Sequence, residues 1–122
     1  MRKVLVATLL MGLVPPDPVA AGERFSCNMS ALTKSERARY AKLTGALLEA
    51  AQETSELKNG YAFRFPPATL MTVSEWVGFE RKCCPFFTFE LEVARDNGPV
   101  TLRITGSEGV KAFIRAEFQL DS

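Results

Sequence analysis

Apolar and polar residues alternate with different periods along this chain, and each change of period marks an expected element. Thr33-Lys34-Ser35-Glu36 has the form of a capping box, which is typical of a helix start. Behind it, apolar positions recur at helical spacing, at Tyr40, Leu43, Leu47 and Ala50. The pattern predicts a long amphipathic helix over residues 34–57, followed by a turn at Asn59-Gly60.

After this turn the period changes from that of a helix to that of a strand. Tyr61, Phe63 and Phe65 alternate with smaller or polar residues. Residues 87–93 and 100–104 alternate in the same way, and the intervening Asp96-Asn97-Gly98-Pro99 is typical of a turn. We therefore expect three strands, of which the last two form a β-hairpin with one apolar and one polar face.

Two further helices complete the expected fold. Pro66-Pro67 ends the first strand, and apolar residues then return at helical spacing over residues 69–83. A last helix carries Val110, Phe113 and Ile114 on one face. The resulting order is α-β-α-β-β-α. This order predicts an α+β fold of two layers, in which a three-stranded sheet packs on about three helices.

Residues 1–21 have the three parts of a secretory signal peptide. Arg2 and Lys3 precede an apolar stretch over residues 4–14, and Val19-Ala20-Ala21 supplies small residues before Gly22. Cleavage after Ala21 leaves 122 − 21 = 101 residues, so we expect residues 22–122 to form a single α+β domain that is periplasmic or secreted. The alternatives are a buried N-terminal helix or a misplaced start codon.

Composition narrows the classes of partner and of chemistry. The chain has 15 basic and 14 acidic residues and no basic run, so we expect no nucleic-acid partner. No stretch approaches the roughly 20 apolar residues that span a bilayer, so we expect no membrane association after signal cleavage. The chain contains no histidine, which excludes a Cys–His nucleophilic enzyme. Its three cysteines are therefore the main candidates for distinctive chemistry.

Glu80 is the least expected residue of the helix predicted over residues 69–83. On a helical wheel it lies in the apolar half, between the directions of Cys83 and Cys84. A carboxylate there is costly unless it is protonated, paired or bound to a metal. Three thiolates suit soft ions, and a carboxylate completes a tetrahedral set. The first hypothesis is that a thiophilic metal or metalloid ion binds Cys27, Cys83 and Cys84, with Glu80 as a fourth ligand or a base beside them.

The second hypothesis is a disulfide at the same place. Adjacent α-carbons are about 3.8 Å apart, whereas disulfides favour about 4.4–6.8 Å, so a Cys83–Cys84 bridge would be strained. Cys27 bonded to either of them would clip the N-terminal segment to the second helix. The chain would then be a non-catalytic structural or partner-binding module, whose leftover thiol or Phe86 meets a protein partner. Simple packing of the cysteines stays open. The chain lacks C-x-x-C, which disfavours a redox enzyme, and no catalytic residue is assigned.

Several stretches of this chain together resemble a group of small bacterial proteins. The likeness covers roughly residues 27–118 and rests on Cys27-Asn28-Met29, Ala31-Leu32-Thr33, Gly60-Tyr61-Ala62-Phe63-Arg64-Phe65, Glu80-Arg81-Lys82-Cys83-Cys84-Pro85-Phe86, Gly98-Pro99, Thr105-Gly106 and Glu108-Gly109-Val110-Lys111. The resemblance implies at most an association with heavy-metal handling. It supports a joint role for the three cysteines and implies no mechanism.

Overall fold

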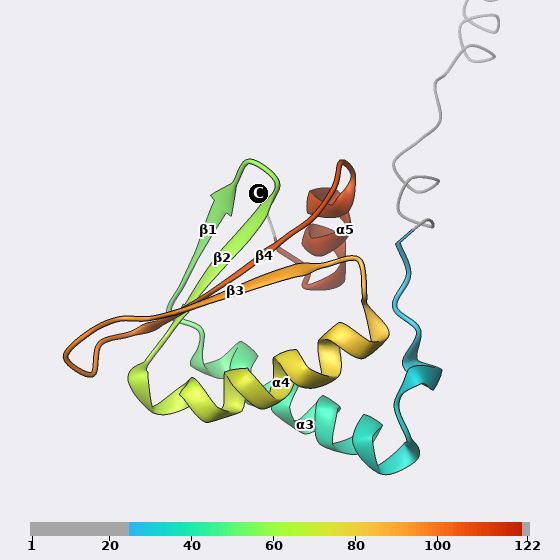
Figure 1. The fold of residues 1–122 in the computed structure, drawn as a ribbon, viewed down its shortest axis with the longest axis horizontal. Helices are drawn as coiled ribbons and strands as arrows, with labels where there is room; N and C mark the ends of the chain where they lie inside the picture. The colour runs from blue at the N-terminus through green and yellow to red at the C-terminus, as the bar shows by residue number, and fades with distance from the viewer. Residues whose placement is uncertain (1–24, 121–122) are drawn as a thin grey trace, which may run out of the picture.

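The fold alternates helices with pairs of strands, as Figure 1 shows for a computed structural model that describes residues 25–120. The expected signal peptide, residues 1–21, lies outside the described residues. The elements are, in chain order, the 3-10 turn η1 (Met29–Ala31), α3 (Lys34–Ala50), β1 (Glu53–Leu57), β2 (Gly60–Phe65), the 3-10 turn η2 (Pro67–Thr69), α4 (Leu70–Cys83), β3 (Thr88–Val93), β4 (Val100–Thr105) and α5 (Val110–Glu117).

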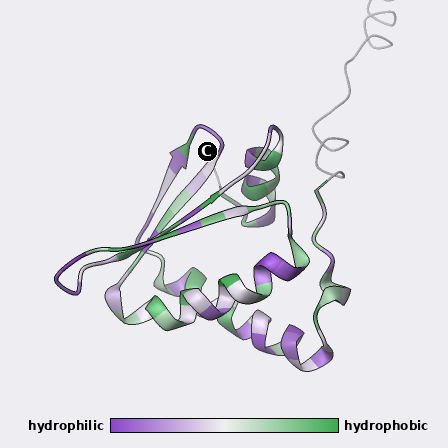
Figure 2. Ribbon diagram, in the orientation of Figure 1, coloured by the Kyte–Doolittle hydropathy of each residue, from purple (hydrophilic) through white to green (hydrophobic). Residues whose placement is uncertain are grey.

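A single antiparallel sheet forms one layer, with the strand order β1-β2-β4-β3. Strands β2 and β3 do not pair directly, because β4 lies between them. Across the sheet, Tyr61 pairs with Ile104, which pairs with Phe89 on its other side, so these side chains share one face. The helices cover this apolar face, and the expected α+β class is confirmed (Figures 1 and 2).

The first helix is shorter than predicted. It begins as expected, because Thr33 and Glu36 form a complete capping box: the Thr33 N–H donates to Glu36 Oε1 at 2.9 Å, and the Glu36 N–H donates to Thr33 Oγ1 at 3.1 Å. Helix α3 ends at Ala50, whereas the sequence pattern predicted a helix to residue 57. The helix prediction was therefore wrong for residues 51–57.

Residues 53–57 instead form the edge strand β1, so the sheet has four strands rather than the predicted three and the order is α-β-β-α-β-β-α. Leu57 lies opposite Gly60, and the intervening Lys58 and Asn59 make a hairpin turn. Four of the five β1 side chains are exposed, so the strand has no buried alternation for a sequence pattern to reveal. Backbone pairing with β2 therefore determines this strand.

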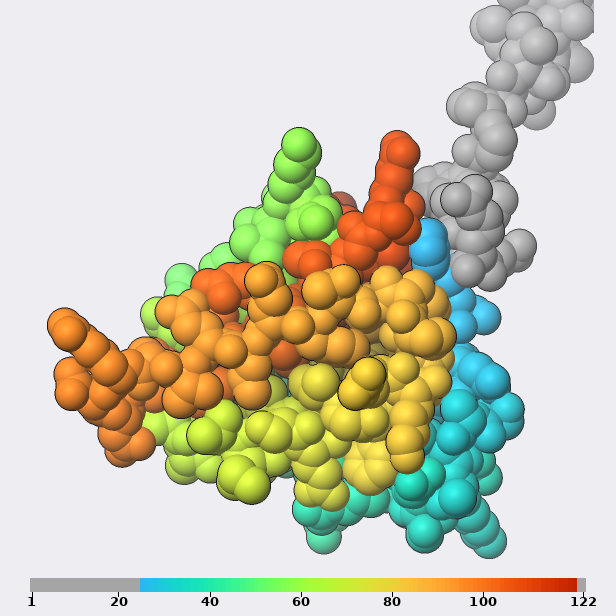
Figure 3. Space-filling view, viewed as in Figure 1, coloured from blue at the N-terminus to red at the C-terminus, as the bar shows by residue number. Residues whose placement is uncertain are grey.

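The second predicted helix and the second hairpin are confirmed. Helix α4 begins at Leu70, one residue after the predicted start, and ends at Cys83 as predicted. In the β3–β4 turn, Asp96 and Asn97 adopt left-handed backbone conformations, with φ of 60° and 56°. Asn and Asp tolerate this region better than most residues, which explains why the turn forms there. In Figure 3 this turn projects from the body of the molecule, beyond α4.

Charged side chains occupy the sheet face that the helices leave open. Arg103 contacts Glu92 at 2.7 Å and Arg64 contacts Glu53 at 3.1 Å. Because these ions are well exposed, each pair contributes little to stability. The buried, helix-facing side of the sheet is therefore where a site has to be sought.

No helix described between residues 25 and 120 is long and apolar enough to cross a membrane.

Candidate functional site

A disulfide joins Cys27 to Cys84 and so connects the N-terminal segment to the end of α4. The two α-carbons are 4.7 Å apart, within the usual range for a disulfide. The Asn28 N–H donates to the Cys83 carbonyl oxygen at 2.7 Å, which holds the same segment by its backbone. The expectation that Cys27 bonds to one of the paired cysteines is confirmed, and the partner is Cys84.

Pro85 explains why Cys84 rather than Cys83 meets Cys27. A residue before proline is disfavoured in helical geometry, and Cys84 caps α4 with φ −126° and ψ 69°. Its N–H still donates to the Glu80 carbonyl oxygen at 2.8 Å, but its side chain no longer follows the helix. Cys84 is fully buried and Cys27 is half-buried. Cys27 is therefore the more accessible residue of the bridge.

Cys83 keeps a free thiol that is fully buried beside the disulfide. Its sulfur lies 3.9 Å from the Cys84 sulfur and donates to the Glu80 carbonyl oxygen at 3.6 Å. Burial, and secondarily the Glu80 charge, raises the pKa of this thiol to about 11. The leftover thiol of the bridge is therefore in the core and not at the surface, where it would have to lie to meet a protein partner directly.

Glu80 is the one charged residue among the fully buried side chains of the described core. Its Oε1 accepts a 2.6 Å hydrogen bond from the Tyr40 hydroxyl, and its Oε2 has no hydrogen-bond partner among the described residues. No lysine or arginine in residues 25–120 forms an ion pair with it. Burial raises the pKa of Glu80 to about 7, Tyr40 opposes this rise, and the Glu117 charge adds to it.

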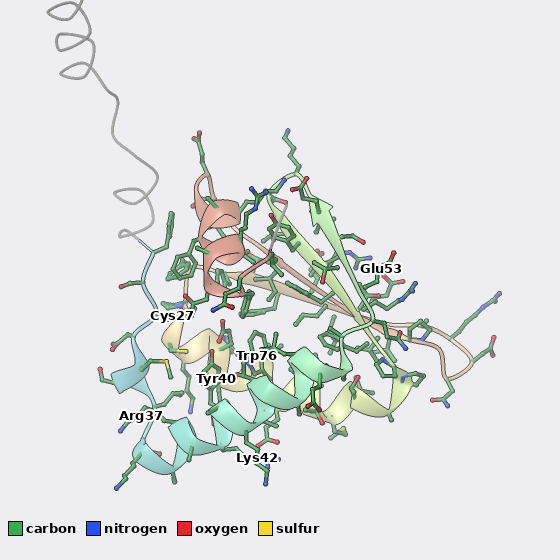
Figure 4. All side chains as sticks on the ribbon, turned by 180° about the vertical axis from the view of Figure 1, so that it is seen from behind. Cys27, Arg37, Tyr40, Lys42, Glu53 and Trp76 are labelled. Carbon is green, nitrogen blue, oxygen red and sulfur yellow. A yellow bond between two sulfur atoms is a disulfide. The ribbon has the colours of Figure 1, made fainter. Side chains whose placement is uncertain are left out.

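Tyr40 is the site residue that sequence reasoning missed. Its spacing on α3 marked it as a core residue, and its ring does stack on Trp76, at 6.3 Å between centroids and 14° between planes. Burial and the Glu80 charge raise the pKa of the Tyr40 hydroxyl far above its usual value, so it stays protonated and donates. Figure 4 shows Tyr40 and Trp76 between α3 and the sheet. The sequence did contain a signal for this contact. Tyr40 places a hydroxyl on the apolar face of its helix, and Glu80 places a carboxylate on the apolar face of another helix, so each is a possible hydrogen-bond partner for the other.

Three of the four predicted site residues place their ligand atoms in one group. The sulfurs of Cys27 and Cys84 and a carboxylate oxygen of Glu80 are all within 4.8 Å of one another. The Cys83 sulfur adjoins this group through Cys84. Two of the three sulfurs are bonded to each other, so they become ion ligands only after reduction. In the oxidised form, the group consists of a disulfide that links the N-terminal segment to the end of α4 and of a buried acid beside it.

Phe86 is packed among other rings rather than standing alone on the surface. Its centroid lies 5.2 Å from that of Phe25, 4.9 Å from that of Phe87 and 5.4 Å from that of Phe113. The side chain is half-buried. This aromatic cluster holds the N-terminal segment next to the disulfide.

Comparison of the chain with protein-family models, with curated proteins and with solved structures gave no match. The resemblance to a group of small bacterial proteins stays a prediction. The geometry of the cysteine–glutamate group is thus the basis for any assignment of function.

Proposed function

We propose that this small exported protein binds a thiophilic ion, a soft metal or a metalloid, at Cys27, Cys83 and Cys84 once the disulfide is reduced. The observation that carries the proposal is the convergence of the Cys27 and Cys84 sulfurs with a carboxylate oxygen of the buried Glu80, beside which the Cys83 sulfur lies 3.9 Å from that of Cys84. A disulfide that only clips two segments would not require a buried acid or a third thiol beside it.

The spacing of the sulfur atoms supports ion binding. Metal–sulfur bonds of about 2.3 Å at tetrahedral angles place two sulfurs about 3.8 Å apart. The sulfurs of Cys83 and Cys84 are 3.9 Å apart, close to that spacing. Reduction separates the sulfurs of Cys27 and Cys84 and frees both as ligands, with Glu80 within 4.8 Å of each.

Charge balance favours a trivalent metalloid over a divalent ion. The site is fully buried at Glu80, Cys83 and Cys84, and no described lysine or arginine pairs with the carboxylate. A buried site tolerates a neutral complex far better than a charged one. Three thiols and one As(OH)₃ exchange to a neutral arsenic tris-thiolate and three waters, with no net release of protons. A divalent ion on three thiolates would leave a buried negative charge.

Access to the site depends on the redox state. An incoming reductant meets Cys27 first, because Cys84 is fully buried and Cys27 is half-buried. Two electrons and two protons convert the bridge to two thiols. Exported proteins usually keep their disulfides, so ion capture would follow reduction by a thiol or phosphine that reaches Cys27. The predicted signal peptide, residues 1–21, is the basis for the exported location.

Native mass spectrometry of the protein reduced with a phosphine tests this proposal, because a dithiol reductant would itself bind arsenite. We expect one arsenic atom per chain, and loss of binding in Cys27→Ser, Cys83→Ser and Cys84→Ser. Ser26→Ala, next to Cys27 on the exposed segment, is the matched control and should bind normally. Failure of the reduced protein to bind arsenite, mercury, copper or zinc stoichiometrically would remove this reading.

The Cys27–Cys84 disulfide favours a second candidate, a non-catalytic structural or partner-binding module. In that case the bridge serves stability alone and Cys83 only packs. The same experiment separates the two candidate functions. A structural module would bind no ion in the oxidised or the reduced state, and Cys83→Ser would change its stability little.

A further inference from the structure

The space between α3, the sheet and the C-terminal residues contains an apolar cavity of about 230 Å³. Its walls come from α3, β1, β2, α4 and β4 and from the residues after α5. They are mainly leucine and aromatic side chains, among them Leu47, Phe63, Phe65, Trp76, Phe118 and Leu120. No lining residue is charged. The exposed Leu48 and Thr54 also line it, so the cavity is reachable from solvent.

Thr44, one of the two hydroxyl-bearing residues of the lining, has its hydrogen bonds satisfied within the protein. Its hydroxyl donates to the Tyr40 carbonyl oxygen at 2.8 Å and accepts from the Trp76 indole N–H at 2.9 Å. Thr44 therefore offers no spare hydrogen-bonding group to a ligand, and no lining residue offers a charge. Thr54 lies on the exposed edge strand β1, at the mouth.

The cavity is large enough to admit a small organic molecule. Protein interiors leave few voids larger than a water molecule. An apolar cavity of about 150 Å³ already stays dry and binds benzene. The present cavity is larger and apolar, and it opens to solvent at one side, so a small hydrophobic ligand can reach it. Its volume is below the roughly 300–1,000 Å³ of ordinary ligand pockets, which restricts the ligand to a small molecule.

We propose that this cavity binds an uncharged hydrophobic molecule about the size of two fused aromatic rings. Such a molecule would contact the ring of Trp76, which is the single tryptophan of the chain. The site is separate from the cysteines in its chemistry, because its lining contains no sulfur and no acid. The two sites share one boundary, since Tyr40 stacks on Trp76 and donates to Glu80.

Titration of the full chain with 1-aminonaphthalene tests the proposal, with the fluorescence of Trp76 as the readout. We expect a saturable change in tryptophan emission at one ligand per chain. Naphthalene-1-sulfonate has the same rings and a fixed negative charge, and it should bind at least about tenfold more weakly, because no lining residue pairs with its charge. Equal binding of the two, or no saturable binding of the uncharged ring, would overturn the proposal.

A filled cavity provides the second arm of the test. Ala51→Leu places a larger side chain in the lining and should weaken 1-aminonaphthalene binding at least about tenfold. Ala46→Leu makes the same change on the exposed face of α3, outside the lining, and should bind as the wild type does. Thr54→Leu fills the cavity from β1 and replaces Ala51→Leu if that variant does not fold. Unchanged affinity in a folded filling variant contradicts the assignment.

Discussion

The hydroxyl of Tyr40 donates a 2.6 Å hydrogen bond to Oε1 of Glu80, from α3 to α4. It is the one hydrogen bond that the structure records for the Glu80 carboxylate within residues 25–120, whose other oxygen has no partner. Burial raises the pKa of Glu80 to about 7, so the acid changes charge near neutral pH in the middle of the core. Its protonation state should therefore affect stability directly.

The first prediction concerns pH. The folded-state pKa of Glu80, about 7, is above its ordinary value of 4.5. Between these two values the folded state holds a proton that the unfolded state has lost, so the free energy of unfolding falls as pH rises. The fall should be on the order of 3 kcal/mol across this window and should level off outside it.

Glu80→Gln should remove this part of the pH dependence, because the amide does not titrate. Urea unfolding from pH 4 to pH 8 measures the free energy of unfolding of the wild type and of the variant. The contributions of the other titrating groups cancel in the difference between the two. Glu75→Gln is the control, since Glu75 is exposed and pairs with Arg39 at the surface. Parallel stability curves for wild type and Glu80→Gln would contradict the prediction.

The second prediction concerns the hydroxyl of Tyr40. Tyr40→Phe removes the hydrogen bond that lowers the pKa of Glu80, so this pKa should rise further. The ionised carboxylate would then be buried with no partner, which costs about 1–3 kcal/mol at pH 8. The cost should be smaller at pH 5, where Glu80 is protonated.

Thermal melting of Tyr40→Phe at the two pH values measures this difference. Tyr61→Phe is the matched control, because the Tyr61 hydroxyl accepts from Arg115 at 2.8 Å and has no buried acid beside it. Its effect should be the same at both pH values. A Tyr40→Phe cost that does not grow with pH would show that the hydrogen bond does not stabilise the charged form.

The third prediction concerns the disulfide. The bridge closes a loop over a sequence separation of 57 residues, which restricts the unfolded chain and contributes about 4 kcal/mol in the chain-entropy model. Cys27→Ser should lower the melting temperature without reductant and change little with it. Cys83→Ser keeps the bridge, so reductant should lower its melting temperature by as much as it lowers that of the wild type. Equal reductant effects on the melting of wild type and Cys27→Ser would argue against the bridge.

The fourth prediction compares two glycines. At Gly60 an added Cβ would collide with the Ile104 carbonyl oxygen on the neighbouring strand, so Gly60→Ala should destabilise the protein by at least about 1 kcal/mol. At Gly45, an exposed position within α3, an added Cβ meets open space. Gly45→Ala should therefore stabilise by about 0.5–1 kcal/mol through helix propensity. Chemical unfolding measures the change in the free energy of unfolding for each variant. A Gly60→Ala variant as stable as the wild type would contradict the close approach of β2 and β4.

The local pattern of the sequence predicted the strands whose apolar and polar residues alternate and the helices with an apolar face, whether or not each apolar residue is buried. Strand β4 buries Val100, Leu102 and Ile104 in strict alternation, and the pattern revealed it. The capping box at Thr33 marked the start of α3 in the same way, because its hydrogen bonds are local. Glu80 was singled out as a buried acid from its place on the helical wheel alone.

The tertiary structure decided what no local pattern contains. Strand β1 exists through backbone pairing with β2, and its exposed side chains carry no signal of burial. The choice of Cys84 over Cys83 as the partner of Cys27 depends on the chain direction at Pro85 and on the Asn28–Cys83 backbone contact. Hydrophobic periodicity reports which face of an element is buried, whereas pairing, disulfide choice and the Tyr40–Glu80 contact depend on which elements meet in space.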